Sequence, residues 1–99
     1  MSDFEFKNIK LELHVIVWGR VQGVGFRMAA RHYALKYNLV GSVQNLEDGN
    51  VEIFAQGSRQ ELEKFIQDIK DHFNHGYIAR MDTKYSKPTH AFHQFMILS

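Results

Sequence analysis

The spacing of hydrophobic residues changes several times along the chain between a two-residue period and a helical period, and this order limits the fold more than any other feature. Apolar residues alternate with polar ones from Ile9 to Val17, which predicts a strand with one buried face that runs into Trp18. Apolar and small residues then recur on one face of a predicted helix that starts near Gly25 or Phe26. The members of that face are Phe26, Ala29, Ala30, Tyr33, Ala34 and Tyr37.

The middle of the chain predicts a hairpin followed by a second helix. Residues 39–46 and 51–56 are short strand-like runs, and the Asp48-Gly49 pair between them is typical of a hairpin turn. Ser58 and Glu61 have the spacing of a capping box, which indicates where the helix begins. The expected buried face of this helix consists of Leu62, Phe65, Ile66, Ile69 and Phe73.

The rest of the chain predicts a strand over about 77–85, a break around Pro88 and a short last strand over 94–98. The predicted order is therefore β-α-β-β-α-β with a short extra strand. This order indicates an α+β fold, the ferredoxin-like α/β sandwich, with an antiparallel sheet of four to five strands and two helices on one face. The length suits a single domain over 1–99, in which residues 1–7 are expected to be flexible.

Composition and charge exclude several classes of function. The 12 Lys and Arg residues are balanced by 11 Asp and Glu residues and are scattered, which does not favour a nucleic-acid partner. The absence of cysteine excludes disulfides, thiolate catalysis and cysteine-bound metals. The first residues lack the pattern of a secretion signal, and no apolar run reaches about 18 residues. We therefore expect no membrane partner and a cytoplasmic location.

Three glycines in seven residues, Gly19, Gly23 and Gly25, precede Arg27. The segment lacks the Lys-Ser/Thr pair of a nucleotide-triphosphatase loop, and Met28 stands where a dinucleotide fingerprint needs its third glycine. A strand end, a glycine loop and a helix start together present backbone N–H groups to one point, which is a common way to hold phosphate or carboxylate. Arg27 in the first turn adds a planar, charged donor suited to phosphate oxygens. The segment therefore predicts an anion site.

Asn45 lies where the first strand of the predicted hairpin ends, which in this fold is near the start of the first helix. Its neutral amide is able to position a water molecule without repelling an anion. Asparagine is equally suited to begin a hairpin turn. The spacing alone leaves both interpretations of Asn45 open.

Two segments, GRVQGVGFR at 19–27 and GSVQNLEDGNVE at 41–52, resemble the signature segments of the acylphosphatase family, and FMI at 95–97 resembles its closing strand. The resemblance covers nearly the whole chain. It implies hydrolysis of small-molecule acyl phosphates to carboxylate and inorganic phosphate, without metal or cofactor. It also implies that Arg27 and the loop bind the phosphoryl group, while Asn45 orients the attacking water. The loop residues concerned are Gly19, Val21, Gln22, Gly23, Val24 and Gly25.

Two positions refine the resemblance. Ser42 departs from it, because the family often has a bulky aromatic residue there, commonly tryptophan. We expect this difference to affect stability and substrate preference rather than the two catalytic positions. Gly25 resembles the bacterial members of the family more than the vertebrate ones.

A non-catalytic module that binds acyl phosphates or other anions is the main alternative, since the same loop would bind phosphate whether or not a water is placed for attack. The histidine pairs at 72 and 75 and at 90 and 93 have no acidic residue at ligand spacing, so no metal is expected. An RNA-binding sheet of this fold would need an aromatic motif that the chain lacks. Nothing in the sequence requires a partner chain, and we expect a monomer.

Overall fold

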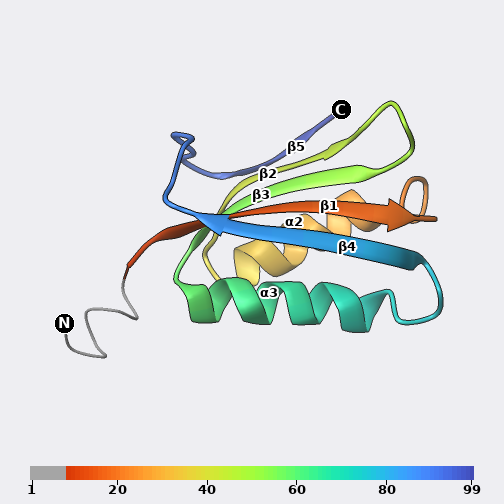
Figure 1. Ribbon diagram of the computed structural model, residues 1–99, viewed down its shortest axis with the longest axis horizontal. Coiled ribbons are helices and arrows are strands. Elements are labelled where there is room, and N and C mark those ends of the chain that lie inside the picture. Colours follow the sequence, from red (N-terminus) through yellow and green to blue (C-terminus); the bar gives the residue numbers. More distant parts are fainter. Residues whose placement is uncertain (1–8) are drawn as a thin grey trace.

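The computed structural model describes residues 9–99, which form five strands and two helices (Figure 1). The prediction that residues 1–7 are flexible lies outside the described residues. The elements follow the predicted order: β1 (Leu11–Gly19), α2 (Phe26–Lys36), β2 (Val40–Asn45), β3 (Val51–Gly57), α3 (Arg59–His72), β4 (Ile78–Ser86) and β5 (Phe95–Leu98). The predicted helices and strands are all present, and their ends differ from the prediction by a few residues at most.

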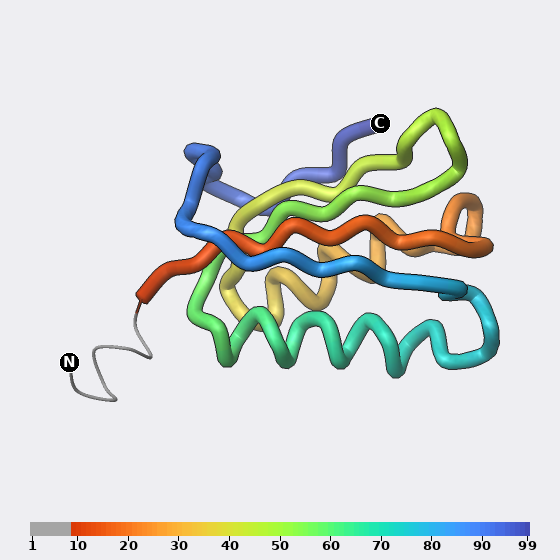
Figure 2. The backbone as a smooth tube through the Cα atoms, viewed as in Figure 1, coloured from red at the N-terminus to blue at the C-terminus, as the bar shows by residue number. Residues whose placement is uncertain are grey.

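The strands form one sheet in the order β4-β1-β3-β2-β5. The pairs β4–β1, β1–β3 and β3–β2 are antiparallel, as predicted, whereas β5 is parallel to β2. The chain from β4 crosses from one edge of the sheet to the other, as the blue tube in Figure 2 shows. Because β4 ends at the end of the sheet where β2 begins, β5 enters in the direction of β2, a detail that the sequence pattern did not predict.

Both helices lie on the same side of the sheet (Figure 1), and the core fills the space between them and the strands. Leu13, Val15 and Val17 face this side from β1 and are completely buried, which confirms the predicted strand period. At the end of the sheet where β1 finishes, the ring of Phe26 stacks on that of Phe73 with centroids 4.9 Å apart. This contact fixes the start of α2 against the end of α3.

The two helices begin in different ways. Ser58 and Glu61 form the predicted capping box at α3, in which the Ser58 Oγ accepts from the Glu61 N–H and the Glu61 Oε1 accepts from the Ser58 N–H. The N-cap of α2 is Gly25, which has no side chain to offer, and the first turn of α2 contains no acidic residue. The positive end of α2 is therefore neither capped nor neutralised by its own sequence.

Candidate active site

The glycine loop connects β1 to α2, and its glycines serve two different purposes. A Cβ on Gly19 would lie 2.2 Å from the Tyr77 carbonyl oxygen, so this glycine allows close contact with the residue before β4. Gly23 and Gly25 have φ angles of 76° and 80°, and a Cβ on either would meet no atom within 4 Å. Their glycine requirement is conformational, because left-handed backbone disfavours other residues. Gly23 and Gly25 therefore shape the loop, whereas Gly19, whose φ of 135° also favours glycine, allows the loop to pack against Tyr77.

The residues between the glycines are held to different degrees. Val21 is buried in the core, whereas Val24 is 37% exposed at the loop surface. The partly buried Gln22 turns its side chain toward the β2–β3 hairpin, where its Nε2 donates to the carbonyl oxygens of Leu46 and Asn50, at 2.9 Å each. The sequence prediction used only the backbone of Gln22, and no sequence signal indicated these two hydrogen bonds.

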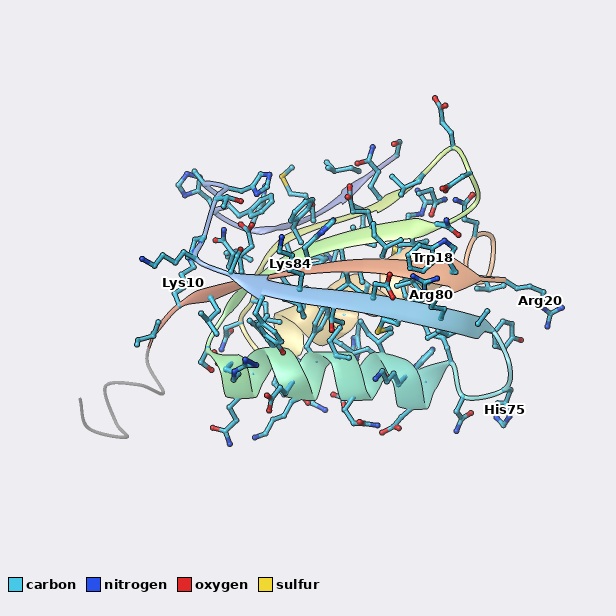
Figure 3. The ribbon with its side chains drawn as sticks, viewed as in Figure 1. Lys10, Trp18, Arg20, His75, Arg80 and Lys84 are labelled. Carbon is cyan, nitrogen blue, oxygen red and sulfur yellow. The ribbon has the colours of Figure 1, made fainter. Side chains whose placement is uncertain are left out.

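Arg27 is the second residue of α2 and is partly buried. Its guanidinium forms no ion pair with a carboxylate within residues 9–99. Arg80, by comparison, makes two hydrogen bonds to Asp82, at 3.0 and 2.7 Å. Arg20, inside the loop, extends outward from the end of β1 (Figure 3) and lies over the Tyr77 ring. The positive charge of Arg27 is therefore available at the uncapped start of α2.

Asn45 is the last residue of β2, as predicted. Because side chains alternate along a strand, the Asn45 side chain lies on the same face of the sheet as that of Val43. Val43 is part of the core between the sheet and the helices. The Asn45 N–H donates to the Ser99 carbonyl oxygen at 2.9 Å. The Asn45 Oδ1 is buried and accepts no hydrogen bond, and no other buried side-chain N or O atom within residues 9–99 is left this way.

The hairpin turn does not use the Asn45 side chain. The side-chain contacts of the turn come from Asp48, whose Oδ1 accepts from the Asn50 N–H at 3.1 Å and whose Oδ2 accepts from Asn50 Nδ2 at 3.0 Å. Of the two interpretations left open by the sequence, the geometry therefore favours an amide free to bind something else.

The glycine loop and the end of β2 lie at the same end of the molecule (Figure 1). The contact from Gln22 to Leu46, the residue that follows Asn45, brings the loop directly beside the end of β2. The structure thus brings together a left-handed glycine loop, an uncapped helix start, and an arginine and a buried amide oxygen that have no partner among residues 9–99. Such a region is suited to an anion and a small polar molecule beside it.

A second buried polar cluster, which the sequence did not predict, lies on the sheet face away from the helices. Glu12 on β1 is 2% exposed and accepts from Gln56 Nε2, from the N–H and hydroxyl of Thr89, and from the N–H of His90. Burial raises the pKa of Glu12, but these hydrogen bonds outweigh burial and lower it to about 2. The carboxylate thus holds the segment between β4 and β5 against the sheet.

Two of the four histidines in the 72/75 and 90/93 pairs contact other side chains. His72 Nδ1 lies 2.9 Å from the Tyr33 hydroxyl, and His90 Nδ1 lies 3.2 Å from Glu12 Oε1. Within residues 9–99, no group of three or more His, Asp or Glu side chains is arranged to hold a metal ion. In the same part of the chain, no helix has the length and apolar character needed to span a membrane.

A family model, curated proteins and solved structures all match this chain. A family model described as Acylphosphatase matches residues 13–97, which include the glycine loop and Asn45. The acylphosphatase of Staphylococcus aureus strain Newman is 53% identical over 57 residues, 58% of this chain and 63% of the relative. The match thus spans less than two thirds of the length of this curated relative.

Solved structures match over more of the chain. The crystal structure of acylphosphatase from Bacillus subtilis has a TM-score of 0.83 and 36% identity, and the match covers 90% of this chain and 99% of that one. An acylphosphatase structure from Coxiella burnetii has a TM-score of 0.81 and 28% identity over 99% of this chain and 100% of that one. These similarities confirm the two-helix, five-strand arrangement predicted from the sequence.

Proposed function

The chain belongs to the acylphosphatase family, as the resemblance of its sequence predicted, and on this premise we propose that it hydrolyses acyl phosphates to carboxylate and inorganic phosphate. The substrate class is the mixed anhydride of a carboxylic acid and phosphoric acid. The leaving group is a carboxylate, which departs readily, so the reaction depends mainly on positioning and on stabilising charge.

The phosphoryl group binds where the glycine loop meets α2. The loop N–H groups from Val21 to Gly25 and the uncapped first turn of α2 supply donors, and Arg27 supplies a permanent positive charge. What supports this assignment is the left-handed backbone of Gly23 and Gly25 together with an arginine that has no carboxylate partner in residues 9–99. In the transition state these donors hold the charge that spreads over the equatorial phosphoryl oxygens.

The attacking water is oriented by Asn45. The single observation that carries this assignment is the buried Oδ1 of Asn45, which accepts no hydrogen bond from residues 9–99 and so keeps its acceptor capacity for water. The water oxygen forms a bond to phosphorus as the bond from phosphorus to the acyl oxygen breaks, and the bonding electrons leave on the carboxylate. The proton released by the water passes to an oxygen of the phosphoryl group, which is itself dianionic and serves as the base.

The first experiment is the hydrolysis of a simple aromatic acyl phosphate, followed by phosphate release with a chelator present. Turnover that survives the chelator supports a metal-independent hydrolase. If the folded protein binds phosphate but shows no turnover, the hydrolase proposal fails and the anion-binding module becomes the better description. Inorganic phosphate is a product of the reaction, so it is also the probe for binding.

We also propose that the chain works as a single acylphosphatase-like domain, as a cytoplasmic monomer, without cofactor, metal or nucleic-acid partner. The monomer is supported by the position of the candidate residues, since the loop, Arg27 and Asn45 all come from one chain and leave no part of the chemistry for a second subunit. Light scattering during size-exclusion chromatography tests the monomer. A dimer mass across the working concentration range would contradict it.

A further inference from the structure

The side chain of Gln22 joins the glycine loop to the hairpin that follows Asn45. Its amide nitrogen has two hydrogens, and both are used, one on the Leu46 carbonyl oxygen and one on that of Asn50, each at 2.9 Å. The Leu46 N–H also donates to the Asn50 carbonyl oxygen at 2.8 Å. Gln22 therefore binds the two residues that close the base of the hairpin.

This junction lies between the glycine loop and Asn45, which the proposed reaction must hold at a fixed distance from each other. The loop on one side binds the phosphoryl group in the proposed mechanism, and Asn45 on the other side is the residue before Leu46. Within residues 9–99, Gln22 makes the side-chain hydrogen bonds that connect residues 20–25 to the rest of the chain. The residues that follow it, Gly23 to Gly25, are exposed and so have little packing of their own to fix the loop.

We infer that the Gln22 side chain is a positioning residue, which fixes the phosphate-binding loop at the distance from Asn45 that in-line attack requires. This inference rests on the proposed function and deepens it. Attack needs the water oxygen aligned with phosphorus, and a misplacement of about 1 Å is able to cost about 100-fold in rate. Loss of both hydrogen bonds frees the loop to shift relative to Asn45 while its own N–H groups still bind phosphate.

A purely structural role for Gln22 would be to stabilise the hairpin, and the chain offers a matched control for this. Asp48 stabilises the same hairpin from the turn, through hydrogen bonds to Asn50, and makes no side-chain hydrogen bond to residues 20–25. Asp48→Ala removes the side-chain hydrogen bonds of the turn and keeps the Gln22 side chain and its two acceptor carbonyls. Gln22→Met removes the donors and keeps a side chain of similar length.

The experiment measures kcat, KM, inhibition by inorganic phosphate and thermal stability for the wild type, Gln22→Met and Asp48→Ala. For Gln22→Met we expect kcat to fall by about 10- to 100-fold while KM and the phosphate inhibition constant change by less than about threefold. Asp48→Ala is expected to lower Tm and keep its kcat. The inference is overturned if Gln22→Met retains its kcat, if its phosphate affinity falls as much as its kcat, or if Asp48→Ala loses as much kcat.

A second measurement separates this inference from the proposed function. Titration with inorganic phosphate is followed by NMR at the side-chain amide of Asn45, which is expected to shift in the wild type because loop and amide are held together. In Gln22→Met, phosphate is expected to bind with similar affinity but with at most about half of that shift. Absence of wild-type turnover would refute the proposed function alone, whereas an unchanged Asn45 shift in Gln22→Met would refute the positioning role.

Discussion

Asn45 and Glu12 each bring buried oxygen atoms to the same sheet, but only those of Glu12 are hydrogen-bonded. The Glu12 carboxylate accepts from Gln56, Thr89 and His90, whereas the Asn45 Oδ1 accepts nothing from residues 9–99. An unpaired buried acceptor costs about 1–3 kcal/mol of stability. Within residues 9–99, the fold therefore hydrogen-bonds the Glu12 carboxylate, whereas it leaves the Asn45 Oδ1 without a donor and Arg27 without a carboxylate partner. We read Glu12 as structural and the other two as groups kept free for a ligand.

The largest effect is expected for Arg27→Ala. Removal of the positive charge at the start of α2 is expected to lower kcat/KM by about 1000-fold, because this charge is placed where negative charge develops in the transition state. Since Arg27 has no ion pair within residues 9–99, its loss is expected to change Tm little. Steady-state kinetics and thermal unfolding test both expectations.

Arg31→Ala is the matched control, because Arg31 is exposed and lies one turn further along α2. Its kinetics are expected to equal those of the wild type. Equal losses of activity in both variants would mean that general positive charge, and not a specific contact from Arg27, is responsible.

Asn45→Ala is expected to lower kcat by about 100- to 1000-fold, because the water loses its orienting group. Phosphate inhibition is expected to persist, since the loop and Arg27 remain. Stability is expected to stay equal or to rise, because the substitution removes an unpaired buried acceptor. Kinetics, phosphate inhibition and urea unfolding together distinguish a ligand-binding amide from a structural one.

Gln44→Ala is the control for Asn45, because Gln44 precedes it in β2 and points to the other face of the sheet. Its only side-chain hydrogen bond within residues 9–99 is to Ser99 Oγ, at 3.4 Å. A marked loss of stability in Asn45→Ala, with kcat retained, would mean that Asn45 has a structural role like that of Glu12.

Inorganic phosphate is expected to stabilise the folded protein only by binding at the glycine loop and Arg27. At about a hundredfold excess over its dissociation constant, a ligand specific for the native state raises the free energy of unfolding by about 2.7 kcal/mol. We expect this increase in the wild type and in Glu12→Gln, and a smaller one in Arg27→Ala. Thermal unfolding with and without phosphate measures it. A full increase in Arg27→Ala would place the phosphate site elsewhere.

The sequence was sufficient to predict the elements that depend on local pattern. The periods of β1 and of both helices, the Ser58 capping box and the Asp48-Gly49 turn all use residues close together in the chain, and the structure confirms each. Asn45 was also correctly predicted at the end of β2. The sequence left two interpretations of Asn45 open, a ligand-binding amide and a turn residue, because it does not show which side chain supplies the hydrogen bonds of the turn.

Contacts between distant segments were beyond the sequence pattern. The strand alternation places Glu12 on the face opposite the core, which predicts an exposed carboxylate, yet the segment after β4 crosses this face and buries it. The parallel entry of β5 has the same origin, because it depends on where that crossing ends. The Gln22 contacts with Leu46 and Asn50 join residues 24 and 28 positions apart. The burial of Glu12, the direction of β5 and the Gln22 contacts therefore all depend on tertiary structure.

Glu12→Gln is expected to lower the free energy of unfolding by about 1–3 kcal/mol near neutral pH, because the amide supplies one acceptor oxygen and no charge to the donors around it. Turnover is expected to stay at the wild-type level, since the cluster lies on the face away from Asn45. Urea unfolding and steady-state kinetics measure the two effects. A loss of turnover without a loss of stability would contradict the structural role of Glu12.

The stability difference between the wild type and Glu12→Gln is further expected to depend on pH in one direction. The pKa of Glu12 falls from 4.5 to about 2 on folding, so the ionised carboxylate stabilises the folded state. Its contribution is complete above about pH 4.5, declines as the pH falls toward about 2 and is absent below that. Asp68 and Asp82 also have lowered pKa values, through Tyr37 and Arg80 respectively, but they are present in both proteins and cancel in the difference. Urea unfolding at about pH 7, 4 and 2.5 therefore isolates Glu12, and a difference that stays constant down to about pH 2.5 would mean that its charge does not hold the segment after β4.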